Sequence, residues 1–121
     1  MKTAWVVEAD AVAAALLAFV LERGSFSARV IGDGGEAKAR LQTEAPPAVV
    51  VLEISLPRAD GFELIETLRA LPAWQQVPVM VVSARGDEMD IARAVRAGAD
   101  AYFVKPFDPD ALMNRIATVT Q

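Results

Sequence analysis

Polar side chains stand at the carboxyl ends of four apolar runs in this sequence, and they define the chemistry that is available. Each of them alone is common: a carboxylate after a strand is often a solvated helix cap, and a lysine is often a surface charge. Two or more of them in one place would indicate a site. The residues are Glu8 and Asp10 after the first run, Glu53 after the third, Ser83 after the fourth and Lys105 after the fifth.

Neither histidine nor cysteine occurs in the chain. This absence removes the usual general base near pH 7 and the commonest metal ligand, and it excludes disulfides and cysteine nucleophiles. Any chemistry must therefore use carboxylates, hydroxyls, lysine or backbone groups. A chain without cysteine also fits a reducing compartment, and we expect a cytoplasmic protein.

Five β-prone segments alternate with five helical segments along the 121 residues. The segment 48–54 (AVVVLEI) lacks polar alternation, which is typical of a strand covered on both faces. Asp10 is placed as the N-cap of the first helix, and Gly24 as its left-handed stop. The predicted strands are 3–7, 26–31, 48–54, 77–83 and 101–104, and the predicted helices are 11–23, 36–44, 62–71, 87–97 and 109–119.

Strict strand–helix alternation predicts a single domain over residues 1–121. The expected fold is a three-layer α/β sandwich with a five-stranded parallel sheet between helices, because right-handed crossovers place helices on both faces. Sites in such sheets lie beyond the carboxyl ends of the strands. The polar residues that follow the strands are therefore expected to meet at one rim.

The first helical segment is unusually apolar. Residues 11–21 carry no charged side chain, yet the segment is too short to span a bilayer and follows acidic rather than basic residues. It is predicted to be a buried helix, and no membrane segment is expected. The net charge of −4 argues against direct binding to nucleic acid, which favours a basic stripe.

From Lys2 to about Val119 the chain resembles the receiver domains of two-component response regulators. The segments that carry the resemblance are WVVEAD, VVVLEISLPRADGFELIETLR, VPVMVVSA and GADAYFVKPFDPDAL. The last is the most specific, because its Gly-Ala-Asp and Lys-Pro-Phe elements have the spacing of that family. The resemblance implies a flavodoxin-like (βα)5 fold and a role in signal transduction and phosphorelay rather than enzymatic activity.

In that family an acidic pair and an aspartate hold Mg²⁺, and the aspartate accepts a phosphoryl group. By position, Glu8 fills the first acidic place and Glu53 stands where the phosphoacceptor aspartate is expected. Ser83 and Lys105 match the hydroxyl and the lysine that contact the phosphate. Tyr102 matches the aromatic residue that turns inward on activation.

The first departure from the family is Ala9, which stands in the second acidic place and cannot coordinate a metal. Asp10 shares a strand face with Glu8 and is a substitute ligand in principle. We favour Asp10 as the helix N-cap, a role worth about 1 kcal/mol. The sequence therefore predicts that Mg²⁺ binding is weak or absent, and no other cofactor is expected.

The second departure is Glu53, whose carboxylate reaches about 1.5 Å further than that of an aspartate. Because a misplacement of about 1 Å can cost on the order of 100-fold in rate, we expect no phosphoryl transfer to it. Glu53 is instead predicted to accept hydrogen bonds from Ser83 and Lys105, as a permanent and partial substitute for phosphate. The alternative is a structural Glu8–Lys105–Glu53 charge cluster without signalling effect.

The sequence thus predicts a phosphorylation-independent protein-interaction module of signal transduction. One alternative is a working phosphoacceptor receiver that uses Glu53 with Asp10 as a metal ligand. Another is a small flavodoxin-like enzyme or nucleotide binder at the same rim, although no Gly-rich phosphate loop supports it.

In receiver domains, output usually runs through the face of the fourth helix, fifth strand and fifth helix. The resemblance implies a signalling partner or an attached output domain there, with a homodimer through the same face as a second arrangement. Met89 and Met113 are predicted to fill the core, and Trp74 to pack inside rather than stay exposed. The candidate charges of the interaction face are Arg93, Arg96, Asp100 and Arg115.

Overall fold

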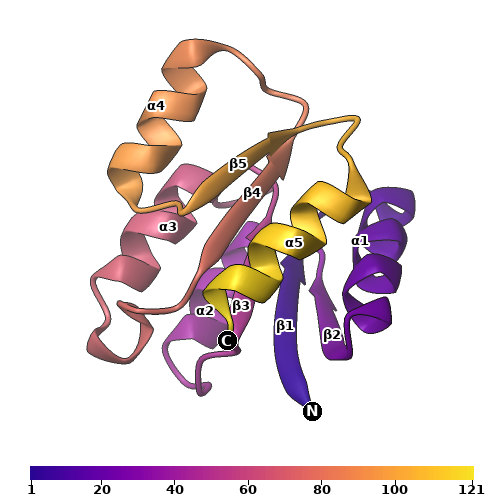
Figure 1. Cartoon of the computed structure of the whole chain (residues 1–121). Helices are drawn as coiled ribbons and strands as arrows, with labels where there is room; N and C mark the ends of the chain where they lie inside the picture. Colours follow the sequence, from indigo (N-terminus) through magenta and orange to yellow (C-terminus); the bar gives the residue numbers. More distant parts are fainter.

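A five-stranded parallel sheet with helices on both faces forms the protein, as seen in a computed structural model that describes residues 1–121 (Figure 1). The strand order is β2-β1-β3-β4-β5, which confirms the predicted three-layer flavodoxin-like fold. The strands are β1 (Lys2–Val7), β2 (Phe26–Ile31), β3 (Val49–Leu52), β4 (Val79–Ser83) and β5 (Ala101–Val104). The helices are α1 (Ala11–Arg23), α2 (Gly34–Leu41), α3 (Gly61–Arg69), α4 (Glu88–Ala97) and α5 (Pro109–Val119), with a 3₁₀ turn η1 (Pro72–Trp74).

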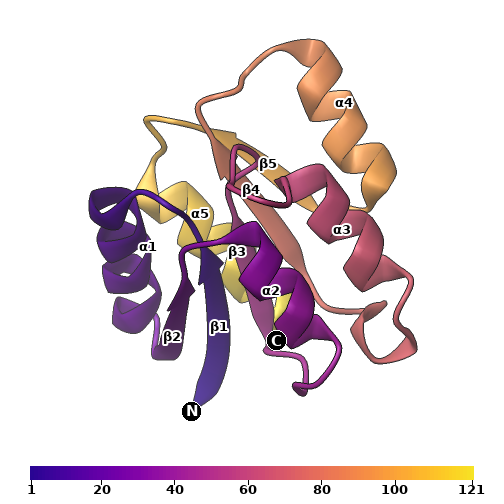
Figure 2. The same cartoon turned by 180° about the vertical axis from the view of Figure 1, so that it is seen from behind.

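Two hydrophobic cores lie on opposite faces of the sheet. Helices α1 and α5 cover one face, whereas α2, α3 and α4 cover the other (Figures 1 and 2). Successive residues of β1 point to different cores: Val6 packs with α1 and α5, and Val7 packs with α2 and α3. All four residues of β3 are buried, as expected for a central strand covered on both faces.

The limits of several elements differ from the prediction. β3 ends at Leu52 rather than at residue 54, so that Glu53 is the first residue after the strand. Helix α2 begins at Gly34 rather than at residue 36, because the Asp33 side chain caps it by accepting from the Glu36 amide. A Cβ at Gly34 would lie 1.7 Å from the carbonyl oxygen of Ala59, so only glycine fits this helix start.

Gly24 ends α1, but not in the predicted left-handed conformation. Its φ is −87°, and the left-handed residue is Ser25, with φ 70°. A Cβ at Gly24 would lie 2.2 Å from Cε of Met113 on α5. The glycine therefore supplies space for a neighbouring side chain rather than conformational freedom.

Helix α1 is buried on one face only, so the prediction of a buried helix is wrong for its other face. Leu17 is 1% exposed and Leu21 is fully buried, whereas Val12, Leu16 and Phe19 are 78%, 46% and 57% exposed. The reason is architectural: a helix in the outer layer of a three-layer sandwich has no element beyond it. No helix combines the length and the apolar character that crossing a membrane would require.

Two further packing predictions had opposite outcomes. Trp74 is buried, and its ring meets that of Trp5 edge to face at 5.0 Å between centroids, which confirms the predicted packing. Met89 lies on the outer side of α4 and is 82% exposed, so its prediction as a core residue is wrong.

Candidate functional site

The polar residues that follow β1, β3 and β5 meet at one rim, as the fold predicts. Val7 of β1 is in register with Leu52 of β3, so the next residues, Glu8 and Glu53, lie side by side, and both are buried. Lys105 reaches between them: its Nζ donates to Oε1 of Glu8 and to Oε1 of Glu53, the latter at 3.0 Å. We call these three residues the acid pocket.

The second carboxylate oxygen of Glu53 folds back onto its own backbone. Oε2 accepts from the amides of Ile54, at 2.6 Å, and Ser55, at 3.2 Å. The extra methylene of glutamate allows this bend, because it lets the carboxylate reach the amides that follow in the chain. Both oxygens of Glu53 are therefore engaged inside the protein.

Ion pairing outweighs burial in the acid pocket. Burial would raise the pKa of Glu53, but the Ser83 hydroxyl, the Lys105 ammonium and the Ser55 amide together hold it below its ordinary value. Burial would likewise lower the pKa of Lys105, but Glu8 and Glu53 raise it. Glu53 and Lys105 thus favour each other's charged forms.

Ser83 is fully buried at the end of β4, and only half of the predicted substitute for phosphate is formed around it. The hydroxyl lies near enough to lower the pKa of Glu53. However, the hydrogen-bond donors to Glu53 are Lys105 and two backbone amides, and Ser83 is not among them. Oγ of Ser83 instead accepts from the amide of Arg85, at 3.1 Å.

Tyr102 lies on β5, half-buried beside the loop that follows β4. Its hydroxyl donates to the carbonyl oxygen of Arg85. Burial, more than any charge, raises the pKa of Tyr102. The two predicted switch residues, Ser83 and Tyr102, thus contact the backbone of the same residue.

Arg85 is the part of the site that the sequence prediction missed. Its backbone binds Ser83 and Tyr102, and its guanidinium pairs with Asp90 at 3.0 Å while lying over the Phe62 ring. The contacts with Ser83 and Tyr102 use only main-chain atoms of Arg85, so the residue type at position 85 could not have predicted them. The same is true of the two amides that bind Glu53.

The residues at the rim do not fit a magnesium ion. Asp10 points away: its carboxylate caps α1 by accepting from the Ala13 amide at 2.8 Å. Glu8 and Glu53 already share the Lys105 ammonium, and no three acidic side chains come together anywhere in the protein. Mg²⁺ prefers octahedral oxygen ligands, and here a lysine nitrogen lies between the only two carboxylates at the rim.

Three of the four charges predicted for the interaction face have partners within the chain. Arg93 lies 4.1 Å from the Phe62 ring centroid, and Arg115 donates to the carbonyl oxygen of Asp100. The Asp100 carboxylate accepts from Arg69 and from the Val79 amide, so it fixes the start of β4. Arg93 makes only this ring contact, and Arg96 alone makes no hydrogen bond, ion pair or ring contact.

The sequence matches the response regulator receiver domain family over residues 4–117. It is 39% identical over 111 residues to the phosphate regulon transcriptional regulatory protein PhoB of Rhizobium meliloti, a match that covers 92% of this chain and 48% of that protein. It is 36% identical over 111 residues to the DNA-binding response regulator MtrA of Mycobacterium tuberculosis, covering 92% and 47%. The chain spans about half the length of these curated relatives.

Solved structures resemble the whole chain. One is a protein of Chloroflexus aurantiacus described as a response regulator, with a TM-score of 0.91, 28% identity and coverage of 98% of this chain and 97% of that one. Another is the receiver domain of the Francisella response regulator 1452, with a TM-score of 0.88, 26% identity and coverage of 99% and 97%. The fold and the family match agree, and the chain belongs to the response regulator receiver domain family.

Proposed function

We propose that this receiver domain is a protein-interaction module of two-component signalling that takes no phosphoryl group on Glu53. One observation carries the proposal: the Lys105 ammonium bridges Glu8 and Glu53, while the remaining Glu53 oxygen binds the Ile54 and Ser55 amides. The carboxylates at the rim are thus bound by the protein's own cation and amides.

Phosphoryl transfer needs conditions that this rim does not offer. The nucleophile must lie in line with its leaving group, and a divalent cation must neutralise the developing charge. Both carboxylate oxygens of Glu53 already accept hydrogen bonds from the protein, and the rim does not fit the cation. A glutamate can reach an in-line position only by giving up its bonds to two backbone amides and to Lys105.

The effect of Glu53 on the conformational state is partial under this proposal. It holds Lys105 in a charge-assisted bond of the kind that a phosphate oxygen would make, but it does not hold the Ser83 hydroxyl. Ser83 and Tyr102 are instead tied to the Arg85 backbone. We therefore infer a fixed arrangement of the loop after β4, with only a partial shift toward an active-like state.

The partner is proposed to be a signalling protein or an output domain of a longer cytoplasmic chain. The relatives that this chain matches over half of their length are named as transcriptional or DNA-binding regulators. The acidic receiver would then contribute protein contacts rather than nucleic-acid contacts. On the α4–β5–α5 face, the side chains free to meet a partner include Arg96 and the exposed Met89, Val95 and Val104.

Incubation with Mg²⁺ and a small phosphodonor, followed by intact-mass measurement, tests the proposal. We expect no adduct on the wild-type protein. Ala9→Asp combined with Glu53→Asp restores both acidic positions, and we expect this variant to gain one phosphoryl group. The restored variant is the control that shows the scaffold and the assay to be competent.

A stoichiometric adduct on Glu53 of the wild type would overturn the proposal in favour of the working phosphoacceptor. NMR separately tests the proposal that Glu53 shifts the domain only partly toward an active-like state. Glu53→Ala should shift the signals of Lys105 and Ser55, whose bonds it removes, more than those of Tyr102. Shifts at Tyr102 as large as those at Lys105 and Ser55 would mean that Glu53 fully controls the conformation of the switch residues Ser83 and Tyr102.

A further inference from the structure

The outer face of α1 carries apolar side chains in a row. Val12, Leu16 and Phe19 follow the helical spacing i, i+4, i+7, and all three are exposed. No charged residue interrupts residues 11–21. A helix that is apolar all round is normally covered all round, and this one is covered by the protein on one side only.

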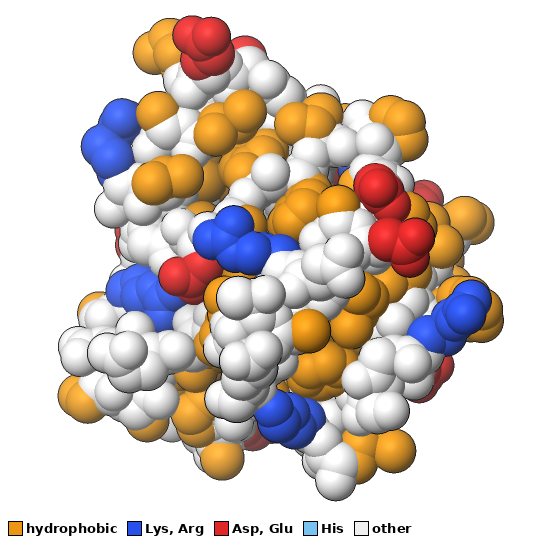
Figure 3. Space-filling model, in the orientation of Figure 1, with side chains coloured by type: hydrophobic (Ala, Val, Ile, Leu, Met, Phe, Trp, Pro, Cys, Tyr) orange, Lys and Arg blue, Asp and Glu red, His pale blue; other side chains and the backbone are white.

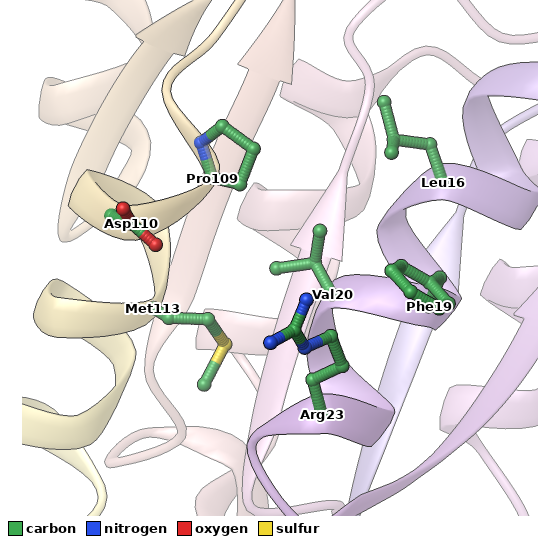
Figure 4. Close-up of a pocket in the computed structure, with 7 residues that line it drawn as sticks. All are labelled: Leu16, Phe19, Val20, Arg23, Pro109, Asp110 and Met113. Carbon is green, nitrogen blue, oxygen red and sulfur yellow. The ribbon is translucent and has the colours of Figure 1, made fainter.

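A hollow of about 250 Å³ lies beside this row, between α1 and α5. We call it the α1–α5 groove, and its lining includes Leu16, Phe19, Val20, Arg23, Asp110 and Met113. The Met113 side chain extends from α5 across it toward α1, where Val20 and Arg23 lie (Figure 4). In the space-filling view, hydrophobic side chains fill the region between α5 and α1, with charges at its margin (Figure 3).

Two charges of the groove have no opposite charge within the chain. Arg23 lies over the Phe19 ring, 5.8 Å from its centroid, but makes no ion pair. The Asp110 carboxylate stands at the start of α5 and makes neither an ion pair nor a hydrogen bond. The groove therefore offers an apolar row, one free cation and one free anion.

We propose that this surface is the interface of a homodimer, in which the α1 helices of two copies pack antiparallel. A twofold axis between Leu16 and Phe19 sets Leu16 of each copy against Phe19 of the other. The same axis brings the C-terminal end of α1, with Arg23, to the N-terminal ends of α1 and α5 of the second copy. There Arg23 meets the free Asp110, so each unpaired charge finds its opposite.

The size of the surface sets the expected strength. The largest exposed apolar patch of a typical monomer measures roughly 300–600 Å² and is often functional. Two patches of that size would bury on the order of 1,000 Å² in total, which is the low end of specific interfaces. We expect a reversible dimer with a dissociation constant in the range of about 10 μM to 1 mM.

The rival dimer face is α4–β5–α5, and its character differs. Val95 on α4 is 54% exposed, similar to Phe19, but α4 carries Glu88, Asp90, Arg93 and Arg96 around it. Such a mixed, charged surface is typical of an ordinary solvated helix. The uncharged row on α1 has no comparable explanation in the monomer.

Sedimentation equilibrium over a concentration series tests the proposal with a matched pair of variants. We expect Phe19→Glu to raise the dissociation constant at least tenfold, because it places a charge at the centre of the interface. Val95→Glu adds the same charge at equal exposure on α4 and should leave the constant within twofold. Circular dichroism checks that both variants are folded.

Charge reversal tests the orientation of the two copies. Arg23→Glu or Asp110→Arg alone should weaken the dimer, and the double variant should recover most of the lost affinity. A protein that stays monomeric at 1 mM overturns the proposal, and the groove would then belong to a different partner. A dimer that Val95→Glu abolishes and Phe19→Glu does not would equally overturn it, in favour of the α4 face.

Discussion

The acid pocket lies at the carboxyl end of the sheet, and the α1–α5 groove lies between two helices on one face of it. The two regions treat their charges in opposite ways. In the pocket, two buried carboxylates share one lysine, and every hydrogen-bonding atom finds a partner within the chain. In the groove, Arg23 and Asp110 remain without an opposite charge beside an exposed apolar row. The pocket is complete in one copy of the chain, and the groove is not.

This difference shows that residues can match the pattern of a family without being free to bind a partner. The pocket holds the residues that match the receiver pattern, but they are saturated by each other and by backbone amides. The residues of the groove do not belong to the receiver pattern, but their exposed apolar side chains are poorly solvated by water. Exposed apolar side chains and unpaired charges are therefore a better indicator of an interface in this protein than a match to the family pattern.

The largest expected effect separates the two faces of α1. Leu17→Ala removes a buried side chain and should lower the free energy of unfolding by about 2–5 kcal/mol. Leu16→Ala, one residue away on the exposed face, should change it by less than about 1 kcal/mol, measured by urea unfolding at low protein concentration. Similar losses for both variants would show that the outer face is buried within a single copy.

Removal of Lys105 tests whether the acid pocket is complete in itself. Lys105→Met leaves Glu8 and Glu53 buried side by side without their cation, and should lower the free energy of unfolding by about 2–4 kcal/mol. Arg96→Met is the matched control, because Arg96 has no partner, and should change stability by about 0.5 kcal/mol or less. Equal losses of stability in the two variants would mean that the ion pairs of Lys105 contribute nothing to the free energy of unfolding.

The pH dependence of stability isolates Glu53. Its pKa in the folded protein is lowered from the ordinary value of 4.5, so its contribution is present above that pH and is lost as the pH falls through the lowered pKa. Glu53→Gln does not titrate. The stability gap between wild type and Glu53→Gln should therefore narrow as the pH falls from about 7 to 3 in chemical unfolding. A constant gap would contradict the ion pair.

The smallest expected effect concerns Asp10. As the N-cap of α1, its replacement in Asp10→Ala should cost about 1 kcal/mol of stability, whereas Asp10→Asn, which also caps well, should cost only a few tenths. Unfolding curves with and without Mg²⁺ distinguish the role of Asp10 as a helix cap from a role as a metal ligand. Protection of the wild type by Mg²⁺ that both variants lose would identify Asp10 as a metal ligand instead.

The fold could be predicted from the sequence because its signals are local. Asp10, Asp87 and Asp108 cap their helices as N-cap residues do, and the central strand β3 is an uninterrupted apolar run. The meeting of Glu8, Glu53 and Lys105 followed from the rule that parallel strands end at one rim. The start of α2 at Gly34 was missed although its signal is also local, because the Asp33 side chain caps this helix.

Details of the site could not be predicted, because they depend on main-chain atoms and on the absence of a neighbour. Nothing in the residue types shows that Glu53 would bind the amides of Ile54 and Ser55 rather than the Ser83 hydroxyl. The sequence of α1 predicted a buried helix, but the protein covers only one face of it. Residue types alone could not show which face would lack a neighbouring element.

The contact between Trp5 and Trp74 has a practical consequence for these measurements. Both indoles are buried in the core between the sheet and α2 and α3, on the face of the sheet opposite the groove. Their emission should change when the protein unfolds and stay constant when two copies associate or when the rim is altered. Intrinsic fluorescence is therefore a clean reporter of unfolding in this protein and is insensitive to its assembly.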